Sequence, residues 1–188
     1  ISVPGSVSPV ITTLPKKTSV LQKLPSIERR YRHFLPVMPW AIERMDASQY
    51  DLIISSSHCV AKGIKKAPGA VHVSYIHAPM RYIWDRFDEY FGPGRASLLV
   101  RFAARMVRPW LQKWDREVSQ ADRIDSLMAN SGYVASQIEA AYGRSAEVIY
   151  PFAEIERFKL PRRAGKNYLM VGAFAPYKRT DMAIEAFN

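Results

Sequence analysis

Two adjacent cations near the end of the sequence stand where an apolar run gives way to a helical pattern. Lys178 and Arg179 follow the turn that opens at Gly172 and precede a helix predicted from Thr180. Glycine lets the backbone approach a ligand closely, and the free N–H groups of a helix N-terminus favour an anion. Gly172, Lys178 and Arg179 therefore predict a diphosphate site. The spacing alone equally fits a solvated Lys-Arg pair, because the segment lacks the G-x-G-x-x-G and P-loop signatures.

A histidine at the end of a predicted strand is the second candidate for chemistry. His77 closes the β-branched run that begins at Ala70, and Arg81 and Tyr82 follow it closely. Such a polar, cationic rim can bind a polar ligand and manage a proton. The alternative is that His77 only caps the strand end, and His72 inside the run is predicted to be structural. No H-E-x-x-H, Cys-His zinc spacing or G-x-S-x-G elbow is present, so a metal site or a hydrolase receives little support.

Alternating strand and helix patterns must position these side chains. The predicted strands are Asp51–Ser55, Ala70–His77, Asp125–Ala129 and Glu147–Tyr150, and the predicted helices are His58–Lys66, Arg95–Gln120 and Tyr133–Tyr142. This alternation predicts an α/β fold with an open, mostly parallel sheet. Ligands bind outside the carboxyl ends of parallel strands. The candidates at that edge are Ser57, His77, Arg81, Tyr82, Asn130 and Ser131.

The long predicted helix Arg95–Gln120 combines an apolar stripe with a basic face. The stripe, predicted to pack inward, consists of Leu99, Ala103, Met106, Trp110 and Trp114. Arg101, Arg105 and Arg108 are predicted to lie away from it. Together with basic and apolar residues of the segment 16–35, this face suits either solvation or docking on an anionic leaflet, and the sequence leaves both open.

Composition shifts predict two domains. Residues 1–151 are interpreted as the first domain, and residues 152–166, which are polar and contain Pro and Gly, as a linker. Residues 167–188 begin a second domain with a predicted strand, Tyr168–Gly172, and a predicted helix from Thr180 to Asn188. Because the chain opens at Ile1 and the helical pattern is still running at Asn188, we expect it to belong to a longer protein.

The bulk composition limits the classes of partner and compartment. A net charge of +10 favours acidic partners such as nucleic acid, anionic lipid or phosphorylated substrates. The single cysteine, Cys59, allows no internal disulfide, which fits a reducing compartment. No apolar run approaches the roughly 18–20 residues of a membrane-spanning helix.

Five segments together resemble a known enzyme family. They are Tyr50–Gly63, Tyr75–Tyr82, Ala129–Ala135, Val148–Pro151 and Gly172–Arg179. In this order and spacing they resemble the retaining GT-B glycosyltransferases of family four, particularly the mannosyltransferase-like members that build surface polysaccharides. The resemblance extends from about Thr18 to the end of the chain.

The resemblance implies two Rossmann-like domains, an N-domain that binds a glycan or lipid-linked acceptor and a C-domain that binds a nucleotide-diphosphate sugar. GDP-mannose is the first expectation for that substrate, and no metal, cofactor or nucleic acid is expected. Lys178 matches the diphosphate-binding lysine of the family, and His77 matches a cleft histidine near the transferred sugar. A cytoplasmic enzyme, peripheral on the inner face of the plasma membrane, is expected.

One position departs from the family pattern, and two features are missing. Many relatives carry Gly-Arg where this chain has Gly172-Ala173, so Arg179 is the candidate to replace the lost cation. The family's glutamate pair would lie beyond Asn188, and the first strand with its Gly-rich acceptor loop would lie before Ile1. We therefore expect the 188 residues alone to be inactive.

Three rival functions remain open on the sequence. The charge also suits a non-enzymatic α/β module that binds phosphate or nucleic acid, although no obvious stacking sheet of aromatics accompanies it. A nucleotide-sugar epimerase of the same GT-B fold would keep the nucleotide sugar without an acceptor. A membrane-surface interaction protein is the third.

Overall fold

The structure, a computed structural model, describes residues 13–157, 165–172 and 178–187. The chain divides into two compact units, Ile1–Pro151 and Phe152–Asn188. The linker at residues 152–166 and the second domain at 167–188 stay predictions.

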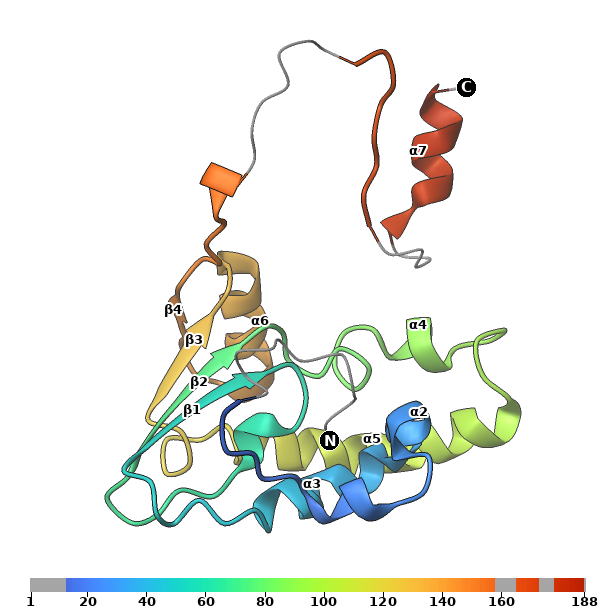
Figure 1. The fold of residues 1–188 in the computed structure, drawn as a ribbon. Coiled ribbons are helices and arrows are strands. Elements are labelled where there is room, and N and C mark those ends of the chain that lie inside the picture. Colours follow the sequence, from blue (N-terminus) through green and yellow to red (C-terminus); the bar gives the residue numbers. More distant parts are fainter. Residues whose placement is uncertain (1–12, 158–164, 173–177, 188) are drawn as a thin grey trace. The chain divides into compact units, whose positions relative to one another are not determined.

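The first unit is built on a parallel four-stranded sheet. Its strands are β1 (Leu52–Ser57), β2 (Val71–Ile76), β3 (Ser126–Ala129) and β4 (Glu147–Val148), in the order β1-β2-β3-β4 (Figure 1). All three pairings are parallel. The four strands predicted in this unit are all present, with β1 longer and the other three shorter than expected, so that His77 follows β2 directly. The unit is thus α/β, a Rossmann-like parallel sheet flanked by helices.

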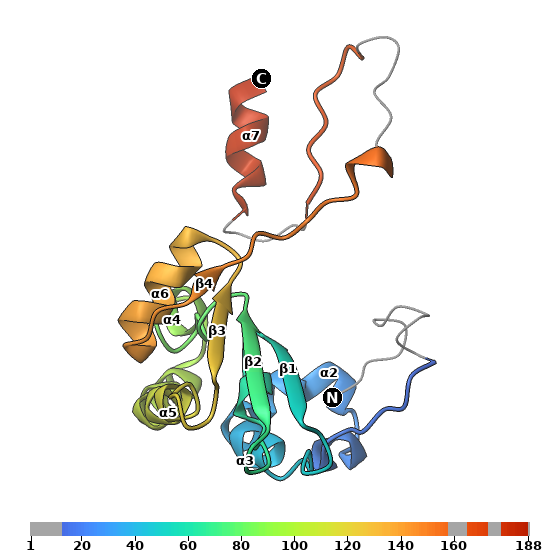
Figure 2. The same ribbon diagram turned by 90° about the vertical axis from the view of Figure 1, so that its left-hand side faces the viewer.

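Helices surround the sheet. The α-helices of this unit are α2 (Ile27–Arg30), α3 (Met38–Glu43), α4 (Phe87–Phe91), α5 (Leu98–Glu117) and α6 (Gly132–Tyr142). Short 3-10 helices are η1 (Val20–Lys23), η2 (Tyr31–Val37) and η3 (Ala61–Gly63). Helices α5 and α6 lie on the same side of the sheet (Figure 2).

Helix α6 confirms its prediction and shows why it begins and ends where it does. The side chain of Ser131 accepts a hydrogen bond from the backbone N–H of Val134 at 3.3 Å, which caps the N-terminus. Gly143 follows the last turn with a φ of 70°, the left-handed conformation that favours glycine. The core beneath α6 contains Ile76, Leu127 and Ile138.

The predicted helix His58–Lys66 is wrong. Strand β1 continues through Ser57, and only the short 3-10 helix η3 follows. Tertiary contacts outweigh local propensity here: Lys62 and Gly63 are both buried, and a Cβ built on Gly63 would lie 2.5 Å from Cζ2 of Trp114. The segment therefore follows the surface of α5 and forms no regular helix.

Helix α5 is present, but the prediction of which of its sides faces the core is wrong. Leu99, Met106 and Trp110 are exposed, and of the predicted stripe only Trp114 is buried. The buried side carries Leu111, Trp114, Asp115 and, just after the helix, Val118. A helix that is apolar on two sides satisfies the hydrophobic periodicity in either orientation, and the contacts of its C-terminal half with Met80 and Ile83 select one.

The second unit contains η4 (Ile155–Arg157) and α7 (Thr180–Phe187). Helix α7 confirms the predicted helix, except that Asn188 lies outside the described residues. The predicted strand Tyr168–Gly172 is wrong for this structure, since its residues are exposed and belong to no sheet. A strand is defined by hydrogen bonds to a neighbouring strand, and all the strands described belong to the sheet of the first unit.

Candidate functional site

Two pockets meet at the carboxyl edge of the sheet, and His77, Ala78 and Arg81 line both. The first, about 190 Å³, extends to Asn130 and Ser131 after β3 and to the first turns of α6. The second, about 480 Å³, extends to His58 after β1 and to the ring of Tyr90 in α4. Of the predicted edge residues, His77, Arg81, Tyr82, Asn130 and Ser131 all line one or both pockets. These residues lie together because, in a parallel sheet, the residues that follow neighbouring strands meet at the same edge.

His77 is held at the end of β2 by contacts with β1 and with the residue that follows β3. Its Nε2 lies 2.8 Å from Oγ of Ser56 in β1, and its backbone N–H donates to the carbonyl of Ser57 at 2.9 Å. The amide Nδ2 of Asn130 donates to the carbonyl of His77 at 3.2 Å. The ring of Tyr75 meets the imidazole edge-on at 5.3 Å. The imidazole is thus exposed to a ligand yet fixed in orientation.

Two adjacent serines on β1 have opposite environments. Ser57 is buried, donates from Oγ to the carbonyl of Cys59 at 3.2 Å, and lines neither pocket. Ser56 is exposed and contacts His77. Sequence reasoning named Ser57 and missed Ser56. Successive side chains of a strand point to opposite faces of the sheet. A strand that includes both Ser56 and Ser57 therefore directs only one of the two toward His77, and this alternation was the signal that could have identified Ser56.

Asn130 and Ser131 form a coupled pair at the start of α6. The hydroxyl of Ser131 donates to Oδ1 of Asn130 at 3.0 Å while accepting the capping bond of α6. This fixes the amide of Asn130 so that its nitrogen faces His77. The same first turns place Gln137 against Asp85, with Nε2 of the amide 2.9 Å from the carboxylate. The first pocket therefore has a wall of fixed polar groups.

The second pocket has a cationic and a phenolic side. Burial, followed by the charges of His77 and Arg81, lowers the pKa of His58 from its ordinary value. Burial, followed by contact with Cys59, raises the pKa of Tyr82, whose hydroxyl lies 2.7 Å from the Cys59 sulfur. Tyr82 therefore stays a neutral phenol, and an anion or a polyhydroxyl ligand would be favoured beside Arg81.

Helix α5 anchors the loop that carries Arg81 and Tyr82. The guanidinium of Arg108 donates from Nε to the carbonyl of Ile83 at 2.7 Å and from Nη2 to that of Trp84 at 3.0 Å. Gln112 donates to the Ile83 carbonyl as well, at 2.7 Å. The prediction that Arg108 lies on an outward basic face is therefore wrong, because its planar guanidinium turns toward the loop and donates to two of the loop's carbonyls.

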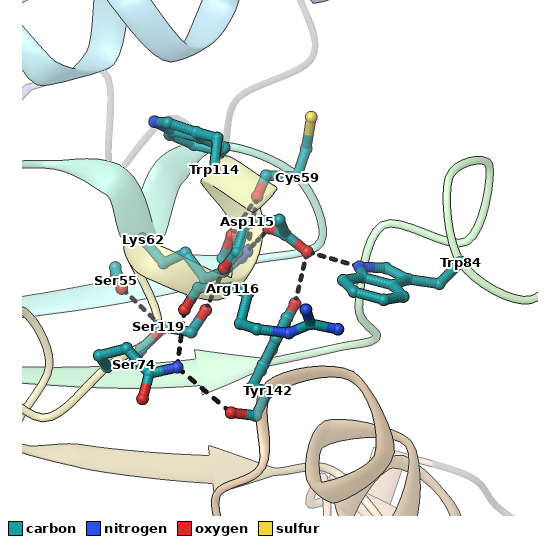
Figure 3. A network of polar contacts seen from close by, with 12 residues as sticks. Ser55, Cys59, Lys62, Ser74, Trp84, Trp114, Asp115, Arg116, Ser119 and Tyr142 are labelled. Atoms are coloured by element: carbon teal, nitrogen blue, oxygen red, sulfur yellow. Dashed lines mark hydrogen bonds and ion pairs between the residues drawn. The ribbon is translucent and has the colours of Figure 1, made fainter. Parts of the chain in front are cut away.

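A buried carboxylate ties the same loop to the rest of the unit. Asp115 pairs with the buried ammonium of Lys62 and accepts from Nε1 of Trp84 at 2.8 Å and from the Tyr142 hydroxyl at 2.9 Å (Figure 3). Burial, and then the charge of Asp115, raise the pKa of Tyr142. These donors come from η3, the loop after β2 and α6. One buried charge thus fixes the relative positions of the three segments that surround the pockets.

The predicted diphosphate residues belong to the second unit. Gly172 and Lys178 are exposed, and residues 173–177 of the turn, including Ala173, lie outside the described residues. Arg179 stands immediately before α7 with a φ of 48°, and its Nε lies 3.2 Å from Oδ1 of Asp181. The guanidinium of Arg179 is therefore at the N-terminus of α7, partly neutralised by a carboxylate of the first turn.

The described residues contain neither a metal-binding cluster nor a membrane-spanning helix. No group of three or more His, Cys, Asp or Glu side chains in that part of the chain is placed to hold a metal ion. Among the helices described, none combines the length and the apolar character needed to cross a bilayer.

Comparison with known proteins identifies the family. Residues 10–157 match the model of a family described as Glycosyltransferase Family 4. No curated protein and no solved structure matches the chain. The family match covers the whole sheet, both pockets and the anchoring helix α5. The chain belongs to Glycosyltransferase Family 4, and its chemistry is that of a glycosyltransferase.

Proposed function

We propose that this chain serves the transfer of a hexose, with mannose as the first choice, from a nucleotide-diphosphate sugar to a glycan or lipid-linked acceptor in polysaccharide biosynthesis. The observation that carries the proposal is the convergence of His77, Arg81 and Asn130 on adjoining pockets at the carboxyl edge of a sheet that matches a glycosyltransferase family.

The acceptor side of the reaction is assigned to the pockets of the first unit. A sugar hydroxyl or a headgroup phosphate suits the fixed amide of Asn130, the hydroxyls of Ser131 and Tyr82, and the cation of Arg81. His77, oriented through Ser56, is assigned to hydrogen-bond the transferred sugar or the attacking hydroxyl. A hydrogen bond that strengthens as charge develops accelerates the reaction more than one made equally to the substrate.

The donor side is assigned to Gly172, Lys178 and Arg179. During transfer the bond from the anomeric carbon to the diphosphate oxygen breaks, and the acceptor oxygen forms the new bond and loses its proton. Negative charge grows on the leaving diphosphate, and cations at a helix N-terminus stabilise it. Arg179 would exchange its contact with Asp181 for the phosphate.

The finer features of the reaction are proposed from the family resemblance. We propose retention of the anomeric configuration, with attack on the same face as the leaving group, and transfer without a metal ion or a cofactor. The enzyme would work in the cytoplasm beside the membrane that carries a lipid-linked acceptor.

A transfer assay tests the proposal in a longer polypeptide that supplies the expected first strand and acceptor loop before this chain and a complete donor-binding domain after it. Labelled GDP-mannose is offered with lipid-linked and glycan acceptors, with and without EDTA, and the product anomer is assigned by NMR. His77→Ala should lower the rate by about 10²-fold or more, and Lys178→Ala should lower it similarly. Ser136→Ala, on the exposed side of α6, is the matched control.

Two outcomes would contradict the proposal. An epimer of the donor sugar formed without acceptor would indicate the epimerase alternative. Unchanged transfer by folded His77→Ala would remove His77 from the site.

A further inference from the structure

Helix α5 exposes a second apolar surface that the core does not use. Leu99, Phe102, Met106 and Trp110 are 83%, 68%, 66% and 47% exposed, respectively. In Figure 1 the N-terminal half of α5 extends away from the sheet on the side of α4. Four large apolar side chains exposed on one helix are too many for the scattered apolar residues of an ordinary surface.

The spacing of these side chains makes one continuous stripe. Successive residues of an α-helix turn by about 100°, so positions 99, 102, 106 and 110 fall along one side. Leu111 and Asp115, which are buried, project on roughly the opposite side. The helix thus has one apolar side that faces the core and another that faces solvent.

The charge around the N-terminal part of the stripe has a single sign. From Phe91 to Trp114 the sequence contains no Asp or Glu, and its basic residues are Arg95, Arg101, Arg105, Arg108 and Lys113. Arg108 is used by the loop and Lys113 pairs with Glu117 at 3.8 Å, whereas Arg95 and Arg105 are exposed. The nearest acidic residue before this segment, Glu89 of α4, pairs with Arg86 at 3.3 Å. An apolar stripe flanked by the exposed cations of Arg95 and Arg105 complements a bilayer, whose interior is apolar and whose surface is anionic.

We propose that this side of α5 docks on an anionic lipid bilayer, with Leu99, Phe102 and Met106 below the headgroups and Arg95 and Arg105 among the lipid phosphates. Trp110 completes the stripe with a side chain that favours the interface between headgroups and acyl chains. A second copy of the chain is the weaker alternative, because a self-complementary interface would bring two basic patches together. Docking is independent of sugar transfer, since none of these residues lines the two pockets.

Vesicle binding by the 188-residue chain tests the proposal directly. Flotation is compared with vesicles of phosphatidylcholine alone and of phosphatidylcholine mixed with phosphatidylglycerol. We expect binding to the anionic vesicles that weakens with salt. Phe102→Gln with Met106→Gln should weaken binding on the order of tenfold or more. Arg95→Glu with Arg105→Glu should weaken it about 25-fold or more, because each nearby cation contributes about fivefold.

A matched control separates the stripe from exposed apolar area in general. Leu52→Gln with Ile54→Gln removes two exposed apolar side chains from β1 and should leave binding unchanged. Brominated lipid should quench the fluorescence of wild type, and Trp110→Phe should lose that quenching whereas Trp40→Phe keeps it. Circular dichroism and thermal unfolding establish that each variant is folded.

Several results would overturn the proposal. They are no binding of the folded wild type to anionic vesicles, equal binding to both vesicle types, or full binding by the Phe102/Met106 variant. A dimer in sedimentation experiments that this variant dissociates would instead assign the stripe to a contact between copies.

Discussion

Oγ of Ser56 and Nε2 of His77 lie 2.8 Å apart and join the ends of β1 and β2 at the mouth of both pockets. This contact gives an exposed imidazole a defined orientation. Ser56 is thus a positioning residue for the histidine that the family resemblance places near the transferred sugar.

Ser56→Ala should reduce transfer about tenfold in the longer polypeptide used for the transfer assay, because the imidazole of His77 loses its orienting partner. The free energy of unfolding should change by less than about 0.5 kcal/mol, since Ser56 is exposed. Ser56→Thr keeps the hydroxyl and should restore the rate. The control is Ser57→Ala, which should cost about 1 kcal/mol of stability without lowering kcat. Equal kinetic effects of Ser56→Ala and Ser57→Ala would refute the positioning role.

Asp115→Asn should destabilise the fold by about 3–5 kcal/mol, because it leaves the ammonium of Lys62 buried without a counter-charge. Urea unfolding measures the change. Glu117→Gln, on the same helix but exposed, should stay within about 0.5 kcal/mol of wild type. Replacing both partners, Lys62→Met with Asp115→Leu, should recover much of the loss. A double variant as unstable as Asp115→Asn would show that the network stabilises by hydrogen bonding to Trp84 and Tyr142 and not by compensating a charge.

Arg108→Lys should loosen the loop after β2, because a lysine cannot donate to the carbonyls of Ile83 and Trp84 from one planar fork. We expect a loss of about 1–2 kcal/mol in the free energy of unfolding. Hydrogen exchange of the backbone amides of residues 83–86 should accelerate. Arg105→Lys, one turn earlier and exposed, is the matched control and should change neither quantity. Identical exchange in the two variants would count against anchoring by α5.

Gly63→Ala should destabilise by about 1–3 kcal/mol through overpacking. The added Cβ would lie 2.5 Å from Cζ2 of Trp114 and 3.2 Å from Cγ2 of Ile42. Gly132→Ala meets no atom within 4 Å at the start of α6 and should be neutral or slightly stabilising. Thermal unfolding of the two variants measures the difference in stability. If Gly63→Ala does not lower the stability, the Trp114 ring can move aside.

The unfolding free energy should fall as the pH drops below about 6.5. Burial of His72 and partial enclosure of His58, whose side chain still reaches solvent, lower the pKa of both in the folded chain from the ordinary 6.5. The unfolded chain therefore takes up these protons first, so the stabilisation present above that pH is lost as the pH falls toward the folded values. His58→Gln should flatten the slope and cost little at neutral pH, because His58 is exposed. His72→Gln should also flatten it, but with a loss at neutral pH, since His72 contacts Ser55 and the Arg123 carbonyl. A slope unchanged by both variants would contradict this origin.

The sequence by itself determined the layout of the first unit and most of the pocket lining. Apolar runs between helical patterns place four parallel strands, and Ser131 and Gly143 mark both ends of α6 by their local chemistry. Because residues that follow parallel strands meet at one edge, His77, Arg81, Asn130 and Ser131 could be grouped before any contact was known.

Only the tertiary structure decided which side of a strand or helix faces the core and which faces the pockets or solvent. The end of β1 determines that Ser56 and not Ser57 meets His77, since a strand reverses its side chains at every residue. The side of α5 that is buried depends on Met80 and Ile83, which lie far from it in sequence, so its periodicity could not distinguish the core face from the exposed stripe. The pairing of Lys62 with Asp115 likewise joins distant segments, and no local pattern encodes which buried charge will find which partner.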